Sequence, residues 1–304
     1  MGQGMPGGES VGDGYSAGDE NGIEAQRYAD LAAARLLYRP ADAEQHLRQA
    51  LSIGASVLPA EQLARLSSQL VMVISGQPGR ELELAVAAMN AAARWEPISD
   101  ADAVHLSFVA ARALHRAGRD EAAVAVFEPP IMAGKTPYPA AEMAVVRGQY
   151  AQSLRRLGRF RAAAQQFAEG ARLVREDPSR VELRADLIWA AAIALDNCDE
   201  DAQALVAYLR AARLWGTLGR VGARARCLRS AAWAQRWSLG ADADDRPWLT
   251  TMGALLAELE QLAVTAPSTE IANELVHTRS QLADMRQDDD DQRGRSTPPA
   301  HRPG

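Results

Sequence analysis

The stretches LHRAGRDEAAVAVF, residues 114–127, and LRRLGRFRAAAQQF, residues 154–167, decide the fold of this chain. They share a leucine, a glycine–arginine pair, an alanine and a phenylalanine at identical spacing, which indicates an internal repeat. In such a unit the glycine ends a first helix, the alanine lets a second helix approach closely, and the phenylalanine fills the space one turn later. Because a single helix pair cannot bury its apolar face, the pattern predicts successive pairs that stack on one another.

Weaker copies extend the repeat in both directions. One copy lacks the glycine but keeps Leu195, Ala204 and Tyr208, and two earlier copies centre on Ala85 and Ala43. The alanines at 43, 85, 123, 163 and 204 therefore recur about every 40 residues. Repetition over most of the chain predicts one continuous array of helix pairs.

The second helix of the clearest copy carries a small residue, an aromatic and a small residue as Ala163, Phe167 and Gly170. This pattern resembles the tetratricopeptide repeat family over about residues 23–265, most closely over 104–215. The period exceeds the family's 34 residues, and most copies lack the usual tryptophan and glycine of the first helix; longer helices, or kinship with the helical domains of bacterial signalling regulators, would account for both. The resemblance implies an all-α, right-handed α-solenoid of five or six antiparallel helix pairs.

Punctuation by Gly, Pro and Asp predicts about thirteen helices, one of which includes the β-like run Val71–Ile74. We expect a disordered Gly-rich acidic tail over 1–22, helical repeats over 23–265, a capping helix over 266–287 and a disordered tail over 288–304. The acidic run Asp288–Asp291 is expected to be solvated.

Composition excludes several classes of protein. The 304 residues are 47% hydrophobic and 5% aromatic with a net charge of −6, which excludes a wholly disordered chain, a collagen, a disulfide scaffold and a membrane protein. No secretory signal is recognisable, so we expect a cytoplasmic location and no membrane partner. Cys198 and Cys227 lack metal or redox spacing and are predicted to be free, buried thiols.

Candidate catalytic and nucleotide-binding patterns are weak. Gly134-Lys135-Thr136 lacks the earlier glycine of a phosphate-binding loop, since Pro129 stands there, and it is predicted to be an ordinary loop. His105 and His115 lie ten residues apart with no further metal ligand at suitable spacing, which favours groove or surface histidines over a metal ligand or general base. We therefore expect no enzyme activity, no metal and no cofactor.

Arginine placement is the informative feature. The resemblance to the tetratricopeptide family implies that the first helix of each pair lines an inner groove. The Lys and Asn of the family's carboxylate clamp are absent here, but arginines at groove positions would hold the carboxylates of an extended peptide by charge-assisted contacts. The residues at these positions are Phe108, Arg112, His115, Arg116, Gln152, Arg155, Arg156 and Trp189, followed by Ile193. The competing interpretation is that these arginines solvate helix ends and pair with neighbouring acids.

The helix expected over 220–239 places Arg226, Arg229, Trp233 and Arg236-Trp237 on one face. Arginine interleaved with tryptophan suits nucleic acid or an aromatic-rich protein. We favour instead tryptophans in the core and arginines in internal ion pairs, and the neighbouring acids at 242, 244 and 245 are candidates for the neutralising charges.

These patterns predict a non-enzymatic protein–protein interaction module, a scaffold or adaptor that binds a peptide or protein segment in an Arg-lined groove. Self-association is an open alternative for the partner. A second hypothesis is a sensor or regulator in transcriptional or signalling control, with nucleic-acid contact through 220–239. Nucleic acid is the less favoured partner because no helix-turn-helix segment is visible.

Overall fold

The computed structural model describes residues 17–36, 38–239 and 245–296. These residues form thirteen α-helices and one short 3₁₀ helix (Pro178–Arg180), with no β-strand among them. The chain divides into two compact units, residues 1–137 and 138–304. The sequence pattern predicted a single repeat region over 23–265 and no division at this point.

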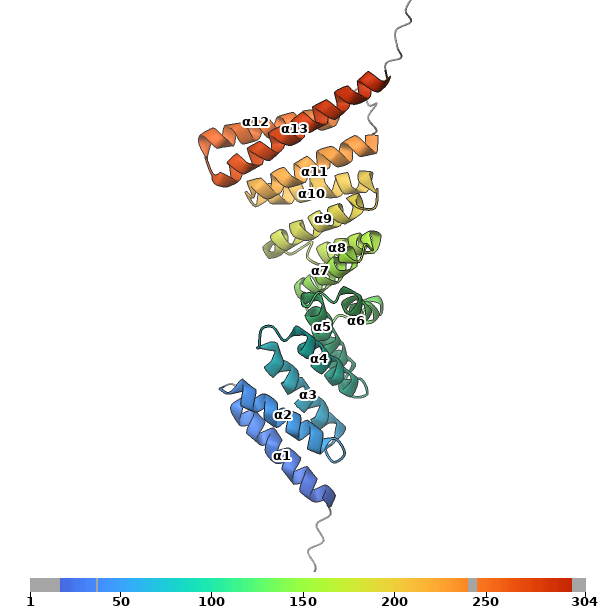
Figure 1. The fold of residues 1–304 in the computed structure, drawn as a ribbon, viewed down its shortest axis with the longest axis vertical. Coiled ribbons are helices and arrows are strands. Elements are labelled where there is room, and N and C mark those ends of the chain that lie inside the picture. The colour runs from blue at the N-terminus through green and yellow to red at the C-terminus, as the bar shows by residue number, and fades with distance from the viewer. Residues whose placement is uncertain (1–16, 37, 240–244, 297–304) are drawn as a thin grey trace, which may run out of the picture. The chain divides into compact units, whose positions relative to one another are not determined.

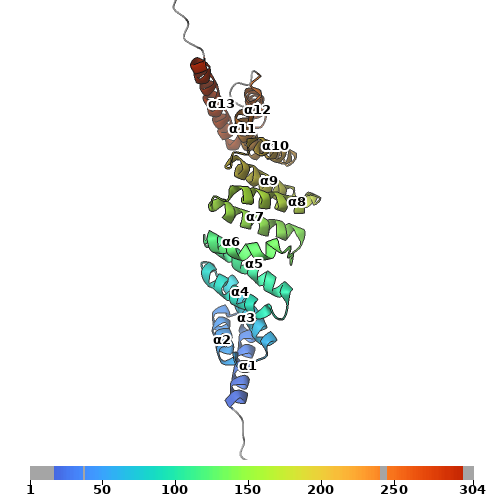
Figure 2. The same ribbon diagram turned by 90° about the vertical axis from the view of Figure 1, so that its right-hand side faces the viewer.

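Consecutive helices pack against one another within each unit (Figures 1 and 2). The first unit contains α1 (Ala17–Arg35), α2 (Pro40–Gly54), α3 (Ala60–Ser75), α4 (Glu81–Trp95), α5 (Asp100–Arg116) and α6 (Asp120–Met132). The second contains α7 (Ala140–Arg156), α8 (Phe160–Leu173), α9 (Val181–Asp196), α10 (Asp201–Thr217), α11 (Val221–Leu239), α12 (Pro247–Thr265) and α13 (Thr269–Ser296). The predicted all-α fold of helix pairs is confirmed, and Val71–Ile74 lies in α3 as expected.

Glycines end the first helices of the two clearest repeats. Gly118 and Gly158 adopt φ angles of +69° and +73°, in the left-handed region. The next residue in each case donates its backbone N–H to a leucine carbonyl five positions earlier: Arg119 to Leu114 and Arg159 to Leu154, both at 2.9 Å. This is the Schellman arrangement, which satisfies carbonyls at the helix end and reverses the chain. The two repeats therefore share the backbone conformation of this turn as well as its sequence.

The copy without a glycine makes the same turn. Asp199 occupies the left-handed region with φ of +60°, and the backbone N–H of Glu200 donates to the carbonyl of Leu195 at 3.0 Å. Aspartate tolerates this region better than most residues. The repeat geometry therefore survives the loss of its glycine.

Small residues occupy the close contacts between helices. The repeat alanines at 43, 85, 123, 163 and 204 are all fully buried, as the pattern predicts. A Cβ added to Gly170 would lie 3.1 Å from the carbonyl oxygen of Ala144, so the helices α7 and α8 approach too closely there for a larger side chain. The aromatic positions Phe127, Phe167 and Tyr208 are buried as well.

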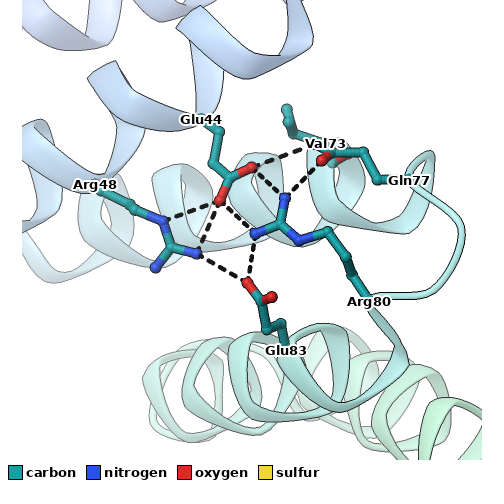
Figure 3. Close-up of polar contacts among 6 residues, drawn as sticks. All are labelled: Glu44, Arg48, Val73, Gln77, Arg80 and Glu83. Carbon is teal, nitrogen blue, oxygen red and sulfur yellow. Dashed lines mark hydrogen bonds and ion pairs between the residues drawn. The ribbon is translucent and has the colours of Figure 1, made fainter. Parts of the chain in front are cut away.

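A charged cluster connects three segments of the first unit (Figure 3). Glu44 on α2 accepts hydrogen bonds from both terminal nitrogens of Arg80, at 2.6 and 2.8 Å, and from Arg48 and Gln77. Arg80 also pairs with Glu83. The Arg80 hydrogen bonds, opposed by burial, lower the pKa of Glu44 from 4.5 to about 2. Glu44 therefore stays ionised although only 12% of its side chain is exposed.

Both predicted tail boundaries are wrong. Residues 17–22 belong to α1, and α13 runs from Thr269 to Ser296, well beyond the capping helix expected over 266–287. The C-terminal extension forms because Asp288 and Asp289 bind Arg236 on α11, so this part of the acidic run is ordered by ion pairs. The predicted tail segments 1–16 and 297–304 lie outside the described residues.

Two smaller predictions concern loops and thiols. Gly134-Lys135-Thr136 forms a loop after α6, where the Lys135 ammonium binds the carboxylate of Asp100 at 2.6 Å. Cys198 and Cys227 are free, and Cys227 is buried while Cys198 is partly exposed. Crossing a bilayer requires a length and an apolar character that no helix in the described part of the chain combines.

Candidate functional site: the groove between α11 and α13

Three residues singled out in the sequence line one groove in the second unit. Arg226, Arg229 and Trp233 contribute its α11 wall. The opposite wall belongs to α13 and consists of Glu274, His277, Ser280, Gln281 and Asp284. The groove is open to solvent, and its lining is mainly polar.

The helices α11 and α13 run parallel, because residues that come later on α11 contact residues that come later on α13. Near the start of both helices, Glu274 accepts hydrogen bonds from Arg226 at 3.1 Å and from Arg229. Further along, the side-chain amide of Gln281 donates to the backbone carbonyl of Arg229 at 2.9 Å. These contacts fix the register of α13 against α11.

The first end of the groove has an excess of positive charge. Glu274 is buried, and its single carboxylate serves both guanidinium groups. Arg229 is largely buried behind it, whereas 44% of the Arg226 side chain is exposed. The pair with Glu274 uses only some of the N–H donors of Arg226, and the remaining donors of this side chain face solvent.

The ring of Trp233 packs against both Trp237 and Arg236. Its ring stacks with Trp237 at a centroid separation of 6.1 Å and an interplanar angle of 15°. The guanidinium carbon of Arg236 lies 5.4 Å from the Trp233 centroid and 5.0 Å from that of Trp237. This cation–π packing gives the groove a fixed aromatic wall.

Arg236 is itself the centre of a buried ionic cluster. Its Nε donates to Asp289 at 3.1 Å, and its Nη1 donates to Asp288 at 3.3 Å. The second oxygen of Asp289 binds Arg246 at 3.2 Å and the indole N–H of Trp248 at 3.3 Å. The side chain of Asp289 is 0% exposed, so the prediction that the Asp288–Asp291 run is solvated is wrong for this residue.

The favoured interpretation of 220–239 is right for the internal ion pairs but wrong for the tryptophans, because Trp237 is exposed and Trp233 is only partly buried and lines the groove. The neutralising carboxylates differ from those expected, because Glu274, Asp288 and Asp289 come from α13. Positions 242 and 244, two of the three candidate acids, lie outside the described residues. Asp245 is exposed and is not the partner of Arg236.

The predicted groove residues of α5 lie in the first unit. Phe108 is wrong as a groove residue: it is fully buried, and its ring lies 6.3 Å from that of Phe127 on α6. Phe108 belongs to the apolar face of α5, and this face packs against α6. Nδ1 of His115 lies 3.9 Å from Asp120, while Arg112 is partly exposed and Arg116 is exposed.

The predicted residues of α7 and α9 lie in the second unit. Gln152 accepts a hydrogen bond from Nε of Arg155 at 3.3 Å, and Arg156 is exposed. Trp189 is partly buried and packs against clusters that include Tyr208 and Trp215. The role of these residues in binding a partner stays a prediction.

The α13 wall was missed in the sequence. A capping helix with a polar face was expected there, but the individual residues Glu274, His277, Ser280, Gln281 and Asp284 were not singled out. An available signal is their spacing: positions 274, 277, 281 and 284 follow the three- and four-residue steps of one helical face. The α11 wall residues Arg226, Arg229 and Trp233 are separated by the same three- and four-residue steps.

Among the residues that the structure describes, no group of three or more His, Cys, Asp and Glu side chains could hold a metal ion. The groove arrangement offers charge-assisted hydrogen bonds and an aromatic face, which are means of recognition.

No protein-family model and no curated protein matches the chain. Among solved structures, the chain is similar to BtubC from P. vanneervenii, with 12% identity over 95% of this chain and 96% of that chain and a TM-score of 0.46. A Podospora anserina chain of nearly identical TPR-like repeats, assigned to the kinesin light chains, has 14% identity over 64% and 96% and a TM-score of 0.46. The apo form of RapI has 12% identity over 86% and 99%, also with a TM-score of 0.46.

Proposed function

We propose that this protein is a non-enzymatic interaction module that binds a protein or peptide segment in the α11–α13 groove. The observation that carries the proposal is the convergence of Arg226, Arg229 and Trp233 with polar side chains of α13 in one open groove. Arginine and tryptophan are the residue types that most often dominate protein interfaces.

The groove is also organised before a partner arrives. Glu274 orients both arginines, and the stack with Arg236 and Trp237 orients Trp233. Ordering such side chains on binding normally costs about 0.5–1.5 kcal/mol for each one. Groups that are already fixed avoid much of this cost, which favours recognition of a segment at this place.

Nucleic-acid contact through 220–239 is the weaker alternative. Binding to phosphates requires arginines whose charge is available to the ligand. Here Arg229 and Arg236 are buried and paired with carboxylates of α13, which leaves Arg226 as the accessible cation among these three. The charge balance of the groove therefore supports a protein partner.

A photo-cross-linking experiment tests the proposal. A photoreactive amino acid replaces His277 inside the groove or, as a matched control, Ala283, which is also exposed on α13 but does not line it. We expect a discrete adduct in the native cell from position 277 and none from 283. Ser280→Trp, which fills the groove, should abolish the adduct, whereas Ala283→Trp should not. The same adducts from both positions, or an adduct that survives Ser280→Trp, would refute the proposal.

A further inference from the structure

The α11–α13 groove has opposite charges at its two ends, and this inference rests on the binding role proposed above. We infer that the groove recognises an extended segment with an acidic and a basic side chain three residues apart, in the pattern acid-x-x-base or its reverse, and with an apolar side chain between them.

At the first end the local charge is positive. Two guanidinium groups, Arg226 and Arg229, face one carboxylate, that of Glu274, and His277 adds ring nitrogens beside them. Arg226 is the more accessible of the two arginines. A carboxylate of the partner would bind here, because Arg226 can donate further hydrogen bonds in addition to the one that it makes with Glu274.

At the second end the local charge is negative. Asp284 is exposed, and the structure gives it no ion-pair partner among the described residues. The neighbouring cations Arg236 and Arg246 do not compensate for it, because Asp288 and Asp289 already balance them within the buried cluster. A lysine or arginine of the partner would complete this end.

The middle of the groove presents the ring of Trp233. Its stacking with Trp237 and Arg236 prevents the ring from turning away. An aliphatic side chain, or the ring of a proline, packs well against such a face. This contact provides the apolar part of the recognition, between two charged ends.

The length of the groove sets the spacing. The guanidinium of Arg226 lies at Glu274, and Glu274 and Asp284 are ten residues apart on α13, which corresponds to about 15 Å of helix. In a polyproline II segment, residues i and i+3 lie on the same face, about 9 Å apart. A glutamate and a lysine at these two positions, with their long side chains extended toward opposite ends of the groove, cover the remaining distance, so an extended segment can place its acid on Arg226 and its base on Asp284 at the same time.

The probes are fluorescein-labelled octapeptides with the central sequences Glu-Pro-Leu-Lys and Lys-Pro-Leu-Glu, which cover both chain directions. Glu-Pro-Leu-Glu and Lys-Pro-Leu-Lys are the like-charged controls. Fluorescence anisotropy with the full chain at low salt measures their affinity. We expect at least one of the mixed-charge peptides to bind about fivefold or more tightly than either like-charged peptide, since each end contributes a separate ion pair.

Variants with matched controls test whether Arg226 and Asp284 bind the two charged side chains of the peptide. Arg226→Gln and Asp284→Asn should each weaken the mixed-charge peptide about fivefold, whereas Arg286→Gln and Asp290→Asn, exposed positions of α13 that do not line the groove, should leave it unchanged. Asp284→Asn keeps the test valid if Arg226→Gln destabilises α13, because Asp284 forms no ion pair with any residue that the structure describes.

The results separate this inference from the proposed function. Equal binding of an all-acidic peptide, no effect of Asp284→Asn, or no peptide binding at all would each overturn the inference. If the adduct at position 277 persists in those cases, the interaction module stands and its partner has another charge pattern. If neither the adduct nor peptide binding is found, both ideas fail.

Discussion

The ion cluster around Glu44 allows a quantitative prediction for the substitution Glu44→Gln. Arg80 and Arg48 hold the carboxylate, and the pKa of Glu44 falls from 4.5 to about 2. A pKa difference of this size corresponds to about 3 kcal/mol of stabilisation at neutral pH. Because its partner Arg48 is about half exposed, we expect solvent screening to reduce the effect to about 2 kcal/mol.

The sign of the pH dependence follows from the lowered pKa. The stabilisation from Glu44 is fully present above about pH 4.5 and is lost as the pH falls toward about 2, because the unfolded chain binds the proton first. The difference in stability between wild type and Glu44→Gln should therefore be constant from pH 8 to 5 and should shrink below that range.

Hydrogen exchange measured by mass spectrometry is the suitable assay, because the chain has two compact units and need not unfold in one step. Peptides from α2 to α4 report the local opening free energy at each pH. Glu61→Gln is the matched control, since Glu61 makes only an exposed pair with Arg65 and should cost less than about 0.5 kcal/mol. A Glu44→Gln effect as small as that control, or one that is equally large at pH 3, would refute the reasoning.

Three further predictions concern caps, a buried charge and a thiol. Gly158→Ala should destabilise the second unit by about 1 kcal/mol because its φ is positive, whereas Asp199→Gly, at the equivalent turn, should be neutral or stabilising; thermal unfolding measures both. Asp289→Asn should cost about 3 kcal/mol and increase hydrogen exchange in α13, since it leaves Arg236 and Arg246 with too few carboxylates. Cys227, whose pKa is raised to about 12 by burial, should not react with iodoacetamide at pH 8 unless the protein is unfolded, which mass spectrometry of the alkylated chain would show.

The repeat could be predicted because its determinants are local. Helix ends at Gly118 and Gly158 and close contacts at Ala123 and Ala163 depend on residue type and short spacing, and the structure confirms them. Asp199 shows where this reasoning reaches its limit. The sequence lacks a glycine there, yet the backbone adopts the same left-handed turn, because the surrounding helices require the reversal and aspartate can adopt it at modest cost.

The groove was only half predictable for a different reason. Helical spacing placed Arg226, Arg229 and Trp233 on one face, but the partners of the arginines lie 45 to 48 residues later on α13. Nothing local to Glu274 distinguishes it from a solvated acid. The prediction for Phe108 was wrong for the opposite reason. Its position on α5 suited a groove residue, but its face of α5 is the one that packs on Phe127. Pairing between distant elements decides both outcomes.

The position of the open groove follows from the way in which α13 is attached. Near its start, Glu274 binds the arginines of α11, and near its end Asp289 is buried against Arg236 and Trp248. At the second attachment Asp288 and Asp289 balance Arg236 and Arg246, whereas at the first attachment two guanidinium groups share the one carboxylate of Glu274 and keep an excess of positive charge. Between them, His277, Ser280 and Asp284 face Trp233 with no ion pair across the gap among the described residues. A groove fixed at both ends and unpaired in the middle can accept a segment without opening the helices, and Asp289→Asn should therefore weaken peptide binding without removing any residue that would touch the peptide.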